Sequence, residues 1–161
     1  MKTIVIYYSL DGNCALVAEA IKKQLGCDCA CLEPEHDVVA GKEGFAKYFH
    51  GGRQVFSKAC PRLKPLGVDI AAYDFVILGT PVWGGSPAPA MRSFLREVSL
   101  KGKKTAVFVC HKGGKGKVFA KMRVLLDGGV PEGEIDFVEP RAIDPESGEK
   151  RAAEWAATLP S

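Results

Sequence analysis

A short polar segment, SLDGNC at residues 9–14, contains the residue types that bind an anion. It follows an apolar run and precedes a helical pattern, so several backbone N–H groups should point at one place, where the helix dipole adds partial positive charge. Ser9 can add a hydroxyl donor and Asn13 a side-chain amide, while Gly12 allows close approach or a positive φ. The segment predicts a phosphate-binding loop, with an ordinary strand-to-helix turn capped by Asn13 as the alternative.

Two further loops are rich in glycine and also follow apolar runs. In GTPVWGG (79–85), Trp83 is a large indole that we expect to pack against something flat, or else to cover the edge of a sheet. CHKGGKG (110–116) would line a ligand with its backbone, or would simply be a solvated lysine loop. Together the three loops predict one site with a phosphate cradle, an aromatic platform and a backbone-lined edge.

Other kinds of site find little support. Neither the first loop nor KGGKGKV (112–118) has the spacing of a nucleotide-triphosphate loop, and a G-x-G-x-x-G nicotinamide motif is absent from the sequence. The six cysteines and three histidines show no metal-ligand spacing. Cys27, Cys29 and Cys31 alternate, so we expect small buried core residues on one face of a strand, with a metal or redox cluster as the alternative. We see no nucleophile–base pair and name no catalytic side chain.

The pattern of apolar residues predicts the elements that position these loops. Strands are expected at 3–9, 27–34, 73–81, 104–111 and 134–140, and helices at 14–26, 88–98, 116–129 and 144–159. Residues 42–61 look helical but are broken at Gly51-Gly52, within the irregular connection 34–72. Such alternation favours a single domain over 1–161, with a parallel sheet covered by helices on both faces and a ligand at the carboxyl ends of the strands.

Composition narrows the class of protein. The 161 residues are 47% hydrophobic and 25% charged, which is ordinary for a globular protein. A net charge of +3 is too weak to predict nucleic-acid binding. The apolar runs are too short for a membrane span, and MKTIVIYYS reads as a first strand rather than a signal peptide, so we expect a cytoplasmic protein.

From end to end the chain resembles the flavodoxin family. The phosphate loop of that family, Ser/Thr-x-Thr-Gly-x-Thr, is similar to residues 9–14, and its Gly-Thr-Pro-x-Trp loop matches residues 79–83. A Gly-Gly-Arg segment, Gly51-Gly52-Arg53, resembles a flavodoxin-like subgroup. The resemblance implies a flavodoxin-like three-layer sandwich with a five-stranded sheet in the order 2-1-3-4-5, non-covalent FMN, and transfer of one or two electrons.

The resemblance also implies which residues hold the flavin. The candidates in the phosphate loop are Ser9, Asp11, Gly12, Asn13, Cys14 and Ala15. Those expected along the isoalloxazine are Thr80, Pro81, Val82, Trp83 and Gly84, where a peptide flip near Gly84 would present a carbonyl to flavin N5. Cys110, His111 and Gly113 are expected near the pyrimidine end, and Arg53 is either a wall of the site or a surface cation.

Departures from the family pattern affect two of these loops. Asp11 and Cys14 replace threonines, which removes two hydroxyls and adds a negative charge. Each replacement should therefore weaken the binding of FMN. In the third loop, basic residues replace the acids that surround the flavin in many flavodoxins, so the flavin should be easier to reduce fully. These basic residues are His111, Lys112, Lys115 and Lys117.

The sequence favours an electron carrier that works with a redox partner protein or a small-molecule acceptor. An FMN-dependent NAD(P)H oxidoreductase of the quinone-reductase type is the alternative, and a module that has lost its flavin is a third possibility. The weakly basic balance suggests an acidic or neutral partner. We expect a monomer or homodimer that uses neither nucleic acid nor a membrane.

Overall fold

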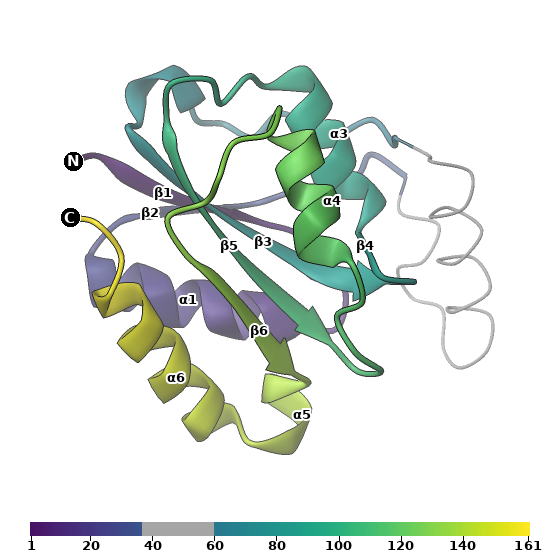
Figure 1. The fold of residues 1–161 in the computed structure, drawn as a ribbon, viewed down its shortest axis with the longest axis vertical. Helices are drawn as coiled ribbons and strands as arrows, with labels where there is room; N and C mark the ends of the chain where they lie inside the picture. Colours follow the sequence, from purple (N-terminus) through teal and green to yellow (C-terminus); the bar gives the residue numbers. More distant parts are fainter. Residues whose placement is uncertain (37–59) are drawn as a thin grey trace.

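Five parallel strands form the central sheet in the part of the chain that the computed structural model describes, residues 1–36 and 60–161 (Figure 1). They are β1 (Thr3–Tyr7), β2 (Asp28–Cys31), β3 (Phe75–Trp83), β5 (Lys104–His111) and β6 (Glu134–Val138). Their order is β2-β1-β3-β5-β6, and every neighbouring pair is parallel. The expected order 2-1-3-4-5 is confirmed, with the two-residue strand β4 (Ser86–Pro87) added as an antiparallel partner of β3.

Helices cover both faces of this sheet, as predicted (Figure 1). One face carries α1 (Asn13–Leu25), α6 (Pro145–Ala157) and the short α5 (Pro140–Ile143), while α3 (Pro89–Glu97) and α4 (Val118–Leu125) lie on the other. A single 3-10 turn (Ile70–Ala72) precedes β3 in the described residues.

Alternation along the buried strands divides the core into two clusters. Ile4 and Ile6 point to the side of α3 and α4, whereas Val5 between them packs with α1 and α6. Residues 75–80 are buried throughout, because β3 lies at the centre of the sheet with helices on both sides.

Local signals fix the helix ends. Gly26 ends α1 with φ +59, a conformation that glycine adopts without steric cost. Asp144 caps α6 by accepting from the Ser147 N–H, and Pro145 occupies the first helical position. Both signals can be read directly in the sequence, as a glycine after a helical pattern and an Asp-Pro pair before one.

The structure corrects several boundaries. β2 ends at Cys31 rather than residue 34, β3 continues to Trp83, and α4 spans Val118–Leu125 rather than 116–129. α5 was not predicted. The helix expected at 42–61 and the Gly51-Gly52-Arg53 segment lie almost entirely outside the described residues.

The alternating cysteines are only partly buried. Cys27 and Cys29 pack against the core beneath α1, and partial burial raises the pKa of the Cys29 thiol to about 12. Cys31 is exposed, so the expectation of a buried core residue is wrong there, because β2 is an edge strand. Within residues 1–36 and 60–161 no group of acidic, histidine and cysteine side chains could hold a metal ion. None of the helices in this part of the chain is both long enough and apolar enough to cross a membrane.

Candidate functional site

The three glycine-containing loops follow the carboxyl ends of β1, β3 and β5, which are adjacent strands of the sheet (Figure 1). The Tyr8 N–H donates to the Gly79 carbonyl at 3.0 Å, which joins the first strand end to the second. The second and third loops touch, since a Cβ on Gly116 would lie 3.0 Å from the Gly85 Cα. The fold therefore brings the three predicted loops to one rim.

The first loop forms the expected start of a helix. Gly12 is the N-cap of α1, with φ +82 and no capping side chain, so the alternative of an Asn13 cap is wrong. Ser9 Oγ accepts from the Ala15 N–H at 3.2 Å. The N–H groups of Asn13 and Cys14 have no hydrogen-bond partner among the described residues, as is usual in a first helical turn. These amides and the Ser9 hydroxyl hydrogen can donate to an anion.

The Cys14 side chain points away from this loop and into the core. It is 1% exposed and contacts Cys110, which is also buried. Burial raises the pKa of the Cys14 thiol well above its usual value, so this thiol is unreactive. Cys14 thus contributes its N–H but not the hydroxyl contact of the threonine it replaces, and Cys110 likewise turns its side chain to the core.

A residue that the sequence analysis missed lies on the first loop. Arg141 of α5 donates its backbone N–H to Asn13 Oδ1 at 3.0 Å, and its Nη1 donates to the Asp11 carbonyl at 2.8 Å. The Asn13 side chain therefore anchors α5. Because 128 residues separate Asn13 from Arg141, no local pattern in the sequence could have revealed the contact.

The second loop is a tight hairpin between β3 and β4. Gly84 and Gly85 have φ +57 and +68, which suits a two-residue turn of type I′. Thr80 is fully buried, and its Oγ1 accepts from the Ala88 N–H at 3.0 Å, so its hydroxyl ties β3 to the start of α3. Gly79 is required by packing alone, since a Cβ there would lie 2.0 Å from Phe108 Cζ. Pro81 and Val82 are half-buried at the end of β3.

Trp83 stands at the rim against another aromatic residue. Its ring packs edge-to-face on Tyr8, with centroids 5.9 Å apart and an interplanar angle of 81°. The indole remains half-buried, whereas Tyr8 is buried. Tyr8, at the end of the first apolar run, is a second residue at the rim that was not predicted.

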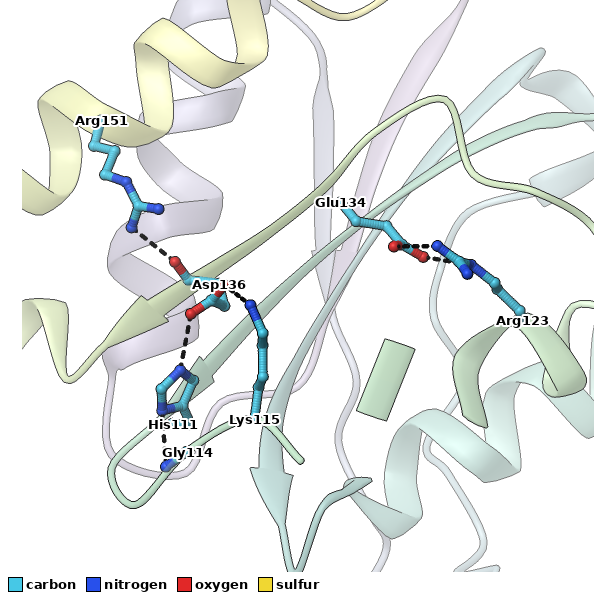
Figure 2. Close-up of polar contacts among 7 residues, drawn as sticks. All are labelled: His111, Gly114, Lys115, Arg123, Glu134, Asp136 and Arg151. Carbon is cyan, nitrogen blue, oxygen red and sulfur yellow. Dashed lines mark hydrogen bonds and ion pairs between the residues drawn. The ribbon is translucent and has the colours of Figure 1, made fainter. Parts of the chain in front are cut away.

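The third loop is held by a polar network on β6 (Figure 2). His111 Nε2 lies 3.0 Å from Asp136 Oδ2, and His111 Nδ1 accepts from the Gly114 N–H at 3.2 Å. Because Nδ1 accepts, the proton of the neutral ring sits on Nε2 and is donated to Asp136. With a side chain only 8% exposed and both nitrogens engaged, His111 supports the loop from beneath. Gly113 is exposed, with open space around it.

Two of the four predicted cations in this loop are neutralised by carboxylates. Lys115 Nζ lies 2.7 Å from Asp136 Oδ1, and Lys112 Nζ lies 3.7 Å from Glu139 Oε1. Partial burial raises the pKa of Asp136, but the hydrogen bonds from Lys115 and His111 and the charge of Lys115 outweigh it and hold the pKa below the ordinary value. These ion pairs therefore weaken the effect that an unpaired basic cluster would have on the reduction potential of a bound flavin.

Two arginines in Figure 2 have a structural role, because each joins a helix to β6. Arg151 of α6 donates to the Asp136 carbonyl at 2.7 Å, and Arg123 of α4 makes two contacts with Glu134, at 2.9 and 2.6 Å. They fasten β6 to the helices on either side of the sheet.

The fold and its rim define the class of this protein, a flavodoxin-like α/β protein. Similar folds include a flavoprotein in complex with FMN from Lactobacillus acidophilus NCFM, with 21% identity, coverage of 91% of this chain and 98% of that one, and a TM-score of 0.73. A WrbA-like flavodoxin protein from Agrobacterium tumefaciens has 18% identity, 97% and 95% coverage, and a TM-score of 0.57. Oxidised Flavodoxin 1 from Bacillus cereus has 21% identity, 99% and 100% coverage, and a TM-score of 0.51.

A family model gives the finer assignment. Residues 1–128 match the model of NADPH-dependent FMN reductase, and the chain belongs to that family. The matched range contains all three rim loops.

Proposed function

We propose that the protein is an FMN-binding flavoprotein that oxidises NAD(P)H. The observation that carries this proposal is the family match over residues 1–128, which spans the phosphate loop, the hairpin and the third loop. The resemblance to flavodoxins favoured an electron carrier, with the NAD(P)H oxidoreductase as the alternative. Membership of a reductase family favours the enzyme.

The residues at the rim suit a flavin mononucleotide. The Asn13 and Cys14 amides, which have no partner within residues 1–36 and 60–161, would hold the phosphate at the positive end of α1 together with the Ser9 hydroxyl. The Gly84-Gly85 turn lets the backbone approach a planar ring closely, and Trp83 offers an aromatic surface beside it.

The redox chemistry belongs to the cofactor. FMN would accept a hydride from the nicotinamide and pass the electrons to an acceptor. This chain would bind and orient the flavin rather than supply a reacting side chain, because the buried Cys14 thiol has a raised pKa and His111 is held by Asp136 and Gly114. The acceptor would be a small molecule, such as a quinone or a free flavin, or a redox partner protein.

Two measurements on purified protein test the proposal. The first is flavin binding, followed by quenching of FMN fluorescence. The second is steady-state oxidation of NADH and NADPH with a quinone or free FMN as acceptor. Binding with turnover is expected, binding without turnover would instead favour the carrier, and failure to bind FMN would contradict both.

A matched pair of glycine variants ties the result to the rim. Gly12→Ala places a Cβ at a residue with φ +82 in the phosphate loop, and should weaken FMN. Gly102→Ala does the same at φ +81 just before β5, at the opposite end of the sheet, where nothing lies within 4 Å. It should cost similar backbone strain, without the 2.6 Å contact to Arg141 Nη1 that a Cβ at Gly12 would make, and should leave FMN affinity unchanged.

A further inference from the structure

Arg141 contacts three consecutive residues of the phosphate loop. Its Nη1 donates to the Asp11 carbonyl at 2.8 Å and its backbone N–H to Asn13 Oδ1 at 3.0 Å. Between these, the side chain passes over Gly12, where a Cβ would lie 2.6 Å from Nη1 and 3.0 Å from Cδ. A larger residue at position 12 would collide with the guanidinium, so Gly12 serves the arginine as well as the turn.

Backbone packing, rather than the side chain alone, places Arg141 there. Glu139 precedes α5 with φ +37, a conformation that non-glycine residues seldom adopt, and its N–H donates to the His111 carbonyl at 3.0 Å. Gly148 of α6 lets Pro140 pack closely, since a Cβ there would lie 2.8 Å from Pro140 Cβ. α5 is thus held between the third loop, α6 and the phosphate loop.

The guanidinium retains capacity to bind an anion. An arginine carries five N–H donors, and within residues 1–36 and 60–161 the Arg141 side chain uses Nη1 to bond the Asp11 carbonyl. Its planar fork matches the oxygens of a phosphate, and its charge persists at any physiological pH. At Gly12 it stands beside the first-turn amides of α1, where an anion would bind.

We propose that Arg141 is a phosphate-binding residue, which holds the loop through Asp11 and Gly12 and adds a full positive charge to the site. This inference rests on the proposed function, because it takes the phosphate to be that of FMN. It gives α5 a role in the site although α5 lies beyond the residues that match the family model. It also offsets the two departures in the loop, the acid at position 11 and the inward-facing Cys14 thiol.

The test compares FMN with riboflavin, which is the same ring system without the phosphate. Both are titrated by fluorescence quenching against the wild type, Arg141→Met and Arg141→Lys. Lys23→Met is the matched control, because it also removes one positive charge from an exposed residue, ten residues along α1 from Asn13 and therefore about 15 Å away. Circular dichroism confirms that each variant is folded.

The expected result is a loss of FMN affinity of roughly tenfold or more in Arg141→Met, the size typical of a hydrogen bond to a charged group, with riboflavin affinity unchanged. Arg141→Lys should recover part of the loss, and it remains the decisive variant if Arg141→Met does not fold. Lys23→Met should bind both ligands like the wild type. Unchanged FMN affinity in both Arg141 variants, or an equal loss of FMN and riboflavin, would overturn the inference alone. Wild-type protein that binds neither ligand would overturn the proposed function and the inference with it.

Discussion

His111 at the end of β5 and Asp136 on the neighbouring strand β6 are joined through Nε2 and Oδ2 at 3.0 Å. The other oxygen of the same carboxylate holds Lys115 at 2.7 Å. One acid on the edge strand of the sheet therefore anchors both the start and the middle of the third rim loop (Figure 2). The support of the loop can therefore be removed by substituting Asp136, without changing any residue of the loop itself.

Asp136 should stabilise the fold in a way that acid removes. Its pKa is held below the ordinary 3.8, so its contribution is present above that value and is lost as the pH falls through the lower pKa of the folded state. The unfolding free energy of wild type minus that of Asp136→Asn should be positive near pH 5 and shrink below about pH 4. Urea unfolding at several pH values measures this difference. Asp127→Asn removes an exposed acid with no ion pair to the described residues and serves as the control. A difference that stays constant from pH 5 to pH 3 would contradict the prediction.

The Lys115–Asp136 pair should leave the potential of bound flavin nearly unaffected, whereas breaking it from either side should shift the potential in opposite directions. Asp136→Asn leaves an uncompensated cation, which favours the anionic reduced ring and raises the potential. Lys115→Met leaves the carboxylate and lowers it. A lone charge about 6 Å from the ring at an effective dielectric of about 20 is worth ~3 kcal/mol, or roughly 0.1 V for one electron. The double variant should return close to wild type. Redox titration of the FMN-loaded proteins checks this, and shifts of the same sign in both single variants would refute it.

The sequence was sufficient for the fold because its signals are local. The alternation of Ile4, Val5 and Ile6 between two cores, the glycine that ends α1, and the Asp144-Pro145 start of α6 can each be read within a few residues. The site was harder to predict. α5 has four residues, too few to show a helical period, and its position depends on a contact across 128 residues. The directions of the Cys14 and Thr80 side chains also follow from tertiary packing, so the motif identified the loops but not which atoms face outward.

Thr80 should prove to be a structural residue of the rim and not a flavin contact. Its buried Oγ1 accepts from the Ala88 N–H, so Thr80→Val leaves that N–H without a partner, which costs about 1–3 kcal/mol of unfolding free energy. Thr80→Ser keeps the hydroxyl and should retain most of the stability. Denaturant unfolding of both variants, with FMN titration alongside, separates the two roles. A Thr80→Val protein as stable as wild type but weaker in FMN binding would show that the hydroxyl serves the ligand instead.

The substitution Asp11→Thr should increase the affinity for FMN. The Asp11 side chain is exposed in a loop that is otherwise suited to an anion, and its negative charge opposes a bound phosphate. Threonine removes the charge and restores the hydroxyl of the family pattern, whereas Asp11→Asn removes the charge alone. The Asp11 carbonyl that accepts from Arg141 belongs to the backbone and is present in both variants. Fluorescence titration should give FMN affinities in the order threonine, asparagine, wild type, with an increase of several-fold for each step of about 1 kcal/mol. Riboflavin affinity should be the same in all three, because it carries no phosphate to repel. Unchanged or weaker FMN binding in Asp11→Thr would mean that the carboxylate lies too far from the phosphate to oppose it.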